Sequence, residues 1–142
     1  MPTVRLQMTS TLSAQELTAV LTDFSSARPD RWPTVDADHF EVHGIGPTWA
    51  EVTEGTAAAW ERARYDWDPA RHRVTVTTHD SKVFGPGGGW VFQLVPLGER
   101  TRVDVELTRQ PSAFTKRILA SLLPLVAPRA LKKSLAGPLR AV

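Results

Sequence analysis

Five short turn sequences divide residues 39–109 into six segments of strand length. The turns read GIGP, TEGT, WDPAR, FGPGGG and PLGER, and each carries the glycine or proline typical of tight turns. Because these connections are too short to hold crossover helices, the strands are expected to form one antiparallel meander. The predicted strands lie near residues 39–44, 48–54, 57–67, 72–80, 89–96 and 101–109.

A strand and a helix are predicted before the meander. Residues 3–9 alternate apolar and polar side chains, which indicates a strand with one buried face. Ser13 and Glu16 have the spacing of a capping box, and apolar residues then recur at helical spacing, so a helix is expected over about 13–23. The next stretch, SSARPDRWPTVD, contains two prolines and has room for at most one short helical turn.

A long apolar-rich segment follows the meander. It begins at Pro111 and predicts a helix that runs to about Ala136, where a Gly-Pro pair ends it. Pro124 and Pro128 each remove a helical hydrogen bond, so this helix is expected to be kinked or divided. The element order is therefore β-α-β6-α, which belongs to the α+β class.

Length and composition fit one domain that spans residues 1–142. The chain is 42% hydrophobic and 23% charged, and no apolar run approaches the roughly 18 residues of a membrane span. It has no cysteine, which excludes disulfides and thiolate chemistry, and its first residues lack the pattern of a signal peptide. A cytoplasmic location is expected.

Charge is distributed unevenly along the chain. Residues 1–109 carry 11 cationic and 15 acidic side chains, a net of −4, whereas residues 110–142 carry 6 cationic and no acidic side chains, a net of +6. The basic segment is interpreted as a solvated helix face, with weak contact to an anionic membrane as the alternative. No aromatic residues are interleaved with its cations, so a nucleic-acid partner is not expected.

Two apparent motifs fail on geometry. GPGGG lacks both the Lys-Ser/Thr ending of a phosphate-binding loop and the G-x-G-x-x-G spacing, and a strand follows it, so it predicts a β-hairpin connection. His39 and His43 lie four residues apart on a predicted strand, a separation of about 13 Å that is too large for a shared metal. No nucleophile-elbow sequence occurs, and neither a metal nor a cofactor is expected.

Strand alternation predicts which side chains face the interior. In residues 101–109 the charged Arg102, Asp104 and Glu106 share the outer face, so the same alternation turns Arg109 inward. In residues 57–67 the outer face is assigned to the arginines, together with Trp60. The polar and aromatic residues assigned to the interior across the four longest strands are Glu61, Tyr65, Trp67, Asp80, Trp90, Phe92 and Arg109.

A buried charge is costly unless it is paired, so the three inward charges need partners. Arg109 is expected to pair with Glu61 or Asp80, or to hold the carboxylate or carbonyl group of a ligand. Structural ion pairs, contact with solvent at strand ends and acid/base chemistry remain open readings for all three residues.

Three segments, together with the element order, carry a resemblance to a known superfamily. They read VRLQMTSTLSAQELTAVLTDFSSARPDRWP, YDWDPARHRVTV and GWVFQLVPLGERTRVDVELTR. The chain resembles the START/Bet v 1-like (SRPBCC) superfamily over essentially its whole length, and in particular its polyketide cyclase/dehydrase and lipid-transport members. The resemblance implies the helix-grip fold, in which a curved antiparallel sheet of about seven strands surrounds a long C-terminal helix above an apolar cavity.

This resemblance leads to a functional prediction, the binding of a hydrophobic small molecule such as a lipid, polyketide, sterol or quinone-like compound. The helix residues expected to complete the cavity are Phe114, Ile118 and Leu122. One alternative is a cyclase or dehydratase that transfers protons through Glu61, Tyr65, Asp80 or Arg109. Another is an interaction domain whose interior is filled by the large aromatic side chains.

Overall fold

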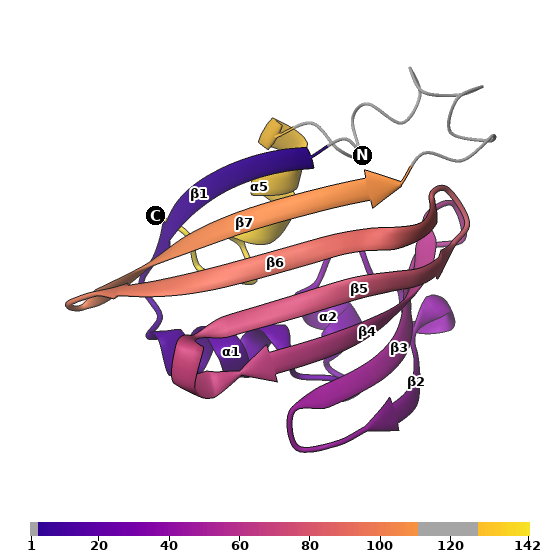
Figure 1. The fold of residues 1–142 in the computed structure, drawn as a ribbon, viewed down its shortest axis with the longest axis horizontal. Coiled ribbons are helices and arrows are strands. Elements are labelled where there is room, and N and C mark those ends of the chain that lie inside the picture. Colours follow the sequence, from indigo (N-terminus) through magenta and orange to yellow (C-terminus); the bar gives the residue numbers. More distant parts are fainter. Residues whose placement is uncertain (1–2, 111–127) are drawn as a thin grey trace.

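The computed structural model describes residues 3–110 and 128–142, which form a seven-stranded antiparallel sheet and the helices beside it (Figure 1). The strand order is β1-β7-β6-β5-β4-β3-β2, so the predicted six-strand meander is confirmed and β1 adds to its last strand. The strands are β1 (Thr3–Ser10), β2 (Glu41–Ile45), β3 (Trp49–Gly55), β4 (Trp60–Asp68), β5 (Arg73–Ser81), β6 (Gly85–Leu97) and β7 (Arg100–Gln110).

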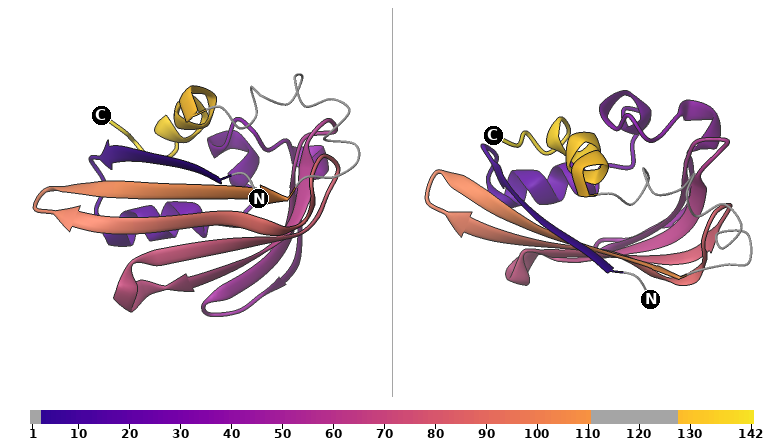
Figure 2. Two further views of the ribbon diagram at one scale, coloured as in Figure 1. Left: turned by 45° about the horizontal axis from the view of Figure 1, so that its top comes forward. Right: turned by 90° about the horizontal axis from the view of Figure 1, so that it is seen from above.

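The described helices all lie on one face of the sheet, inside its curve (Figure 2). They are α1 (Ala14–Leu21), α2 (Arg28–Arg31) and α5 (Pro128–Ala136). Single 3-10 turns lie between α2 and β2 (η1, Ala37–His39) and between β4 and β5 (η2, Pro69–Arg71). The predicted capping box at the start of α1 is confirmed, because Ser13 and Glu16 exchange side-chain and backbone hydrogen bonds. The expected α+β class is confirmed as well.

The core lies between the inner face of the sheet and these helices. Val103, Val105 and Leu107 of β7 are buried, as their alternation with charged residues predicts, and Leu17 and Leu21 of α1 pack against the sheet. The outer face of the sheet is polar. The hydrophobic face of the sheet is therefore covered by helices, and the polar face is exposed to solvent.

The last four residues fasten the end of α5 to β1. The Ser10 hydroxyl donates a hydrogen bond to the backbone oxygen of Leu139 at 2.5 Å, and the backbone N–H of Val142 donates to Thr9 at 2.8 Å. Leu139 is fully buried. These contacts hold α5 over the interior of the sheet at a fixed place.

The glycine-rich segment is not the hairpin connection that its sequence predicts. Residues 85–89 belong to β6, and the connection is the shorter stretch 82–84. A Cβ on Gly89 would lie 1.8 Å from the backbone oxygen of Val76, and one on Gly88 would lie 2.4 Å from that of Thr108. These glycines therefore let three neighbouring backbones approach closely at an irregular part of the sheet.

The predicted inward position of Asp80 is wrong. Arg62 pairs with Asp80, but the next residue of β4, Ala63, pairs with Thr78, so His79 is an extra residue in β5. A β-bulge of this kind shifts the alternation by one position. Asp80 is consequently exposed, and Ser81 takes the inward position opposite Glu61.

The predicted terminal helix is only partly covered by the described residues. Its portion from Pro128 to Ala136 is helical and ends before the Gly-Pro pair, as expected. The predicted break at Pro124 lies outside the described residues. In the described part of the chain, no helix has the length and apolar character needed to cross a bilayer.

Candidate ligand-binding cavity

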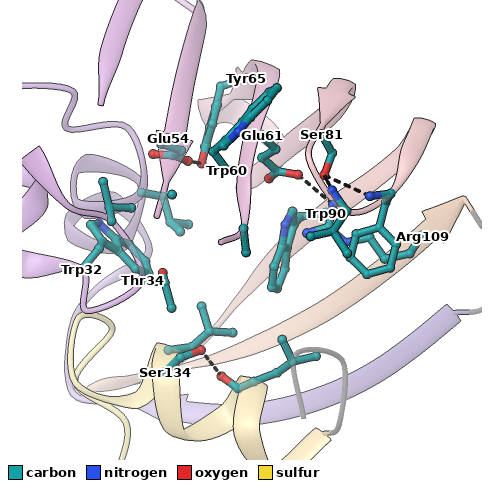
Figure 3. A pocket seen from close by; sticks show the side chains of 18 of the residues that line it. Trp32, Thr34, Glu54, Trp60, Glu61, Tyr65, Ser81, Trp90, Arg109 and Ser134 are labelled. Carbon is teal, nitrogen blue, oxygen red and sulfur yellow. Dashed lines mark hydrogen bonds and ion pairs between the residues drawn. The ribbon is translucent and has the colours of Figure 1, made fainter. Parts of the chain in front are cut away.

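A cavity of about 330 Å³ lies between the inner face of the sheet and the helices α2 and α5. Its walls are side chains from β3 to β7, from the segment that follows α2, and from Leu131 and Leu135 of α5 (Figure 3). Six of the described residues in the lining are aromatic: Trp32, Trp60, Tyr65, Phe84, Trp90 and Phe92.

Two of these aromatic residues, Trp90 and Phe92, form a stacked pair on β6, called here the aromatic wall. Trp90 and Phe92 occupy alternate positions of the strand, with ring centroids 5.7 Å apart and an angle of 7° between the ring planes. Phe84 stands at the neighbouring hairpin connection, where the Ser81 hydroxyl accepts the backbone N–H groups of Val83 and Phe84 at 3.1 and 3.2 Å. The wall therefore presents an extended aromatic surface to the cavity.

Arg28, Glu54 and Tyr65 form a buried polar group, called here the Arg28 cluster. Arg28 comes from α2, Glu54 from β3 and Tyr65 from β4. The guanidinium donates to Glu54 from Nε at 2.6 Å and from Nη2 at 3.4 Å, and Nη2 also donates to the Tyr65 hydroxyl at 3.0 Å. Its Nη1 donates to the backbone oxygens of Leu21 and Asp23 at 3.2 and 2.9 Å, so all five N–H groups of Arg28 have acceptors.

The charge states within the Arg28 cluster are set by burial and by neighbouring charges. Burial raises the pKa of Tyr65 well above its usual value, and the Glu54 carboxylate raises it further. The phenol therefore stays protonated and donates a hydrogen bond to Glu54. Burial alone would lower the pKa of Arg28, but Tyr65 and Glu54 outweigh burial and raise it. The cluster is a neutral assembly of one cation, one anion and one phenol.

A second polar group, called here the Arg109 cluster, consists of Arg109 on β7, Glu61 on β4 and Thr78 on β5. Arg109 Nη1 donates to Glu61 at 2.7 Å and to the Thr78 hydroxyl at 3.2 Å, and that hydroxyl donates to Glu61 at 3.1 Å. The guanidinium also lies 5.0 Å from the ring centre of Phe84 and 5.7 Å from that of Trp90. The predicted pairing of Arg109 with Glu61 is therefore confirmed.

Five of the predicted binding residues line the cavity: Glu61, Tyr65, Trp90, Phe92 and Arg109. Trp67 is half-buried and packs against Phe24 of the core, outside the cavity lining. Asp80 is exposed on the opposite face of the sheet, for the reason given above. Phe114, Ile118 and Leu122 lie outside the described residues. Ligand contact stays a prediction for all of these residues.

The lining residues that the sequence analysis did not predict include Arg28, Trp32, Glu54 and Trp60. Glu54 shares the inward face of β3 with Ala50 and Val52, so the alternation used for the longer strands would have found it. Arg28 and Trp32 lie in an irregular proline-bearing stretch with no periodic signal. Trp60 was assigned to the outer face, but it begins β4, where alternation does not fix the direction of a large ring.

Within residues 3–110 and 128–142, no three His, Asp or Glu side chains lie close enough together to hold a metal ion. The charged side chains of the cavity are instead used in arginine–glutamate pairs. The cavity therefore presents hydrogen-bonding groups beside an aromatic wall.

Several solved structures are similar to this chain over almost its whole length. A protein from Thermus thermophilus is 17% identical and has a TM-score of 0.78, with 98% of this chain and 95% of that chain covered. The aromatase/cyclase Zhui from Streptomyces sp. R1128 is 17% identical with a TM-score of 0.76, and the alignment covers 98% and 92% of the two chains. A START superfamily protein from Mycobacterium smegmatis is 18% identical with a TM-score of 0.69 and 97% coverage of both chains.

These likenesses show that the chain has the helix-grip fold of START/Bet v 1-like proteins, as its sequence predicts. No protein-family sequence model matches the chain, and no curated protein sequence matches it. Identities this low establish the fold alone and identify neither a ligand nor a reaction.

Proposed function

We propose that the protein binds a hydrophobic small molecule in the cavity between the sheet and the C-terminal helix. The observation that carries this proposal is the cavity itself, whose volume of about 330 Å³ falls within the roughly 300–1,000 Å³ typical of ligand pockets. Apolar and aromatic side chains form most of its wall, and a small number of polar groups face it. An open interior of this size favours ligand binding over an interaction domain with a filled core.

The aromatic wall narrows the ligand classes that fit. Trp90 and Phe92 present nearly parallel rings, against which a flat ring system packs with more contact than a flexible acyl chain does. Polyketide-like and quinone-like compounds are therefore better candidates than acyl-chain lipids.

Binding without catalysis is the better-supported form of this proposal. A general acid or base needs a free proton position that faces the substrate. The Tyr65 hydroxyl donates a hydrogen bond to Glu54, and the Glu61 carboxylate accepts hydrogen bonds from Arg109 and Thr78. The likeness to an aromatase/cyclase keeps a cyclase or dehydratase as the alternative.

Native mass spectrometry of the purified protein tests the proposal directly. We expect a co-purifying small molecule that is released on denaturation and can be identified by its mass. In a parallel screen of fatty acids, sterols, quinones and aromatic polyketides, a true ligand at 100 times its dissociation constant stabilises the fold by about 2.7 kcal/mol. The absence of any bound molecule, with no shift in thermal unfolding or tryptophan fluorescence across the panel, contradicts the proposal.

A cavity-filling variant separates binding in the cavity from binding on the surface. Ala130 lines the cavity from α5, whereas Lys132 is exposed on the same helix. We expect Ala130→Phe to abolish binding of the identified ligand, because the new ring occupies its space, and Lys132→Phe to leave binding unchanged. Equal affinity in the two variants would place the ligand elsewhere.

Weak contact with an anionic membrane is a separate prediction for the basic face of α5. Arg129, Lys132 and Lys133 are exposed there, and each cation near such a surface contributes about 1 kcal/mol. We expect salt-sensitive co-sedimentation with vesicles that contain phosphatidylserine, reduced in the double variant Lys132→Gln/Lys133→Gln. Co-sedimentation with neutral phosphatidylcholine vesicles to the same extent would rule out this contact.

A further inference from the structure

The charges on the cavity wall cancel one another. Of the described residues that line the cavity, four carry a charge at neutral pH: Arg28, Glu54, Glu61 and Arg109. They form two pairs, with N–O distances of 2.6 Å for Arg28–Glu54 and 2.7 Å for Arg109–Glu61. A ligand that brought a net charge into this space would therefore find no uncompensated opposite charge in the described wall.

The two arginines differ in the donors that they leave free. Arg28 donates all five of its N–H groups to protein oxygens. Arg109 donates from Nη1 alone: its Nε is buried without a partner, and Nη2 has no acceptor among the described residues. Because Nε is buried beyond the reach of a ligand, the two N–H groups of Nη2 are the donors that a ligand acceptor in the cavity can engage.

The surroundings of Arg109 also define the part of the ligand that it meets. Its guanidinium lies between Phe84 and Trp90, at the edge of the aromatic wall formed by Trp90 and Phe92. Trp90 and Arg109 lie side by side on the cavity wall (Figure 3), so a ring system packed beside Trp90 would place an edge substituent near Arg109. An oxygen on the ring edge would accept a hydrogen bond from the free donors.

From the balanced charges and the free donors we infer that the ligand is an uncharged aromatic carbonyl compound, such as an aryl ketone or quinone, and that Arg109 and Glu61 together select it over the corresponding carboxylate. This inference rests on the proposed function, since it concerns the same cavity. Arg109 supplies the hydrogen bond, and Glu61 neutralises the cation that would otherwise attract an anion. Selectivity against negative charge is thus a property of the pair.

Three naphthalene probes of equal ring size separate the possibilities in calorimetric titrations. The probes are 2-acetylnaphthalene, which carries a neutral carbonyl, 2-naphthoate, which carries a carboxylate, and 2-ethylnaphthalene, which has no acceptor. For the unmodified protein we expect 2-acetylnaphthalene to bind at least about tenfold more tightly than either of the others.

Glu61→Gln provides the sharper test. Glutamine keeps an oxygen that accepts from Arg109 but removes the negative charge, so we expect 2-naphthoate to bind about tenfold more tightly than before while 2-acetylnaphthalene changes little. Glu51→Gln is the matched control, because Glu51 pairs with Arg64 away from the cavity lining. It should change neither affinity. Thermal unfolding checks that both variants fold. If Glu61→Gln does not fold, the three-probe comparison in the unmodified protein still tests the inference.

The outcomes distinguish the inference from the proposed function. Equal affinity for all three probes, or tighter binding of 2-naphthoate by the unmodified protein, overturns the inference and leaves binding in the cavity intact. An unchanged affinity of folded Glu61→Gln for 2-naphthoate also overturns it. Failure of all three probes to bind counts against both.

Discussion

The Arg28 and Arg109 clusters contain similar residue types but differ in burial and in how many arginine donors are paired. Each pairs an arginine with a glutamate on the sheet and adds one neutral hydroxyl, Tyr65 in the first cluster and Thr78 in the second. The Arg28 side chain is 3% exposed, and the Arg109 side chain is 14% exposed. Arg28 has an acceptor for every donor, whereas Arg109 Nη2 has no acceptor among the described residues.

The difference follows from where each arginine is attached. Arg28 lies on a four-residue helix between α1 and the sheet, and it satisfies the backbone oxygen of Leu21 at the end of α1. It also lies over the rings of Phe24, Trp32 and Tyr65, at 4.5 to 5.5 Å from their centres. Arg28 therefore joins the helical layer to the sheet, while Arg109 joins three strands within the sheet. The Arg28 cluster therefore stabilises the fold, and the Arg109 cluster is the one for which we propose ligand recognition.

Removal of the Arg28 side chain is expected to have the largest effect on stability. Arg28→Met leaves Glu54 buried beside Tyr65 alone, and breaking a buried ion pair costs about 3–5 kcal/mol. Urea unfolding measures this loss. The double variant Arg28→Met/Glu54→Leu removes both charges and should recover much of it. A loss below that of Arg109→Met would contradict the structural role of the Arg28 cluster.

Arg109→Met should destabilise the protein less, by about 1–3 kcal/mol. Glu61 remains 15% exposed and keeps its hydrogen bond from Thr78, so its orphaned charge is partly solvated. In contrast to Arg28→Met, this variant is expected to lose the preference for 2-acetylnaphthalene over 2-ethylnaphthalene. Calorimetric titration of both probes checks this, and an intact preference in folded Arg109→Met would transfer the recognition role to another residue.

The neutral members of the two clusters differ in their pH dependence. Because the pKa of Tyr65 is raised in the folded protein, the folded state keeps the phenol proton above pH 10, where an unfolded tyrosine loses it. The associated stability is present below about pH 10 and is lost as the pH rises further. We expect urea unfolding between pH 9 and 11 to show a smaller decline for Tyr65→Phe than for the unmodified protein. The same decline in both proteins would contradict the raised pKa.

Local patterns explain how much of this contrast the sequence could predict. The alternation of β4 and β7 brought Glu61 and Arg109 to one face, although 48 positions separate them. The same rule failed at Asp80, because one extra residue in β5 reverses the alternation, and no local signal marks that bulge. The position of Arg28 in the cavity wall was not predicted, because its partners Glu54 and Tyr65 lie 26 and 37 positions away and its own segment has no periodicity. Strand pairing was predictable, whereas contacts between the helical layer and the sheet were not.

The smallest expected effect concerns Thr78, the neutral member of the Arg109 cluster. Thr78→Val keeps the shape of the side chain but removes the hydroxyl that accepts from Arg109 and donates to Glu61, which costs about 0.5–1.5 kcal/mol. Thr78→Ser retains the hydroxyl and serves as the control. Because Arg109 Nη1 still reaches Glu61 at 2.7 Å, charge balance is preserved, and the preference for 2-acetylnaphthalene over 2-naphthoate should survive in both variants. Loss of that preference in Thr78→Val alone would show that the hydroxyl, and not the pairing of charges, decides which ligand the cavity accepts.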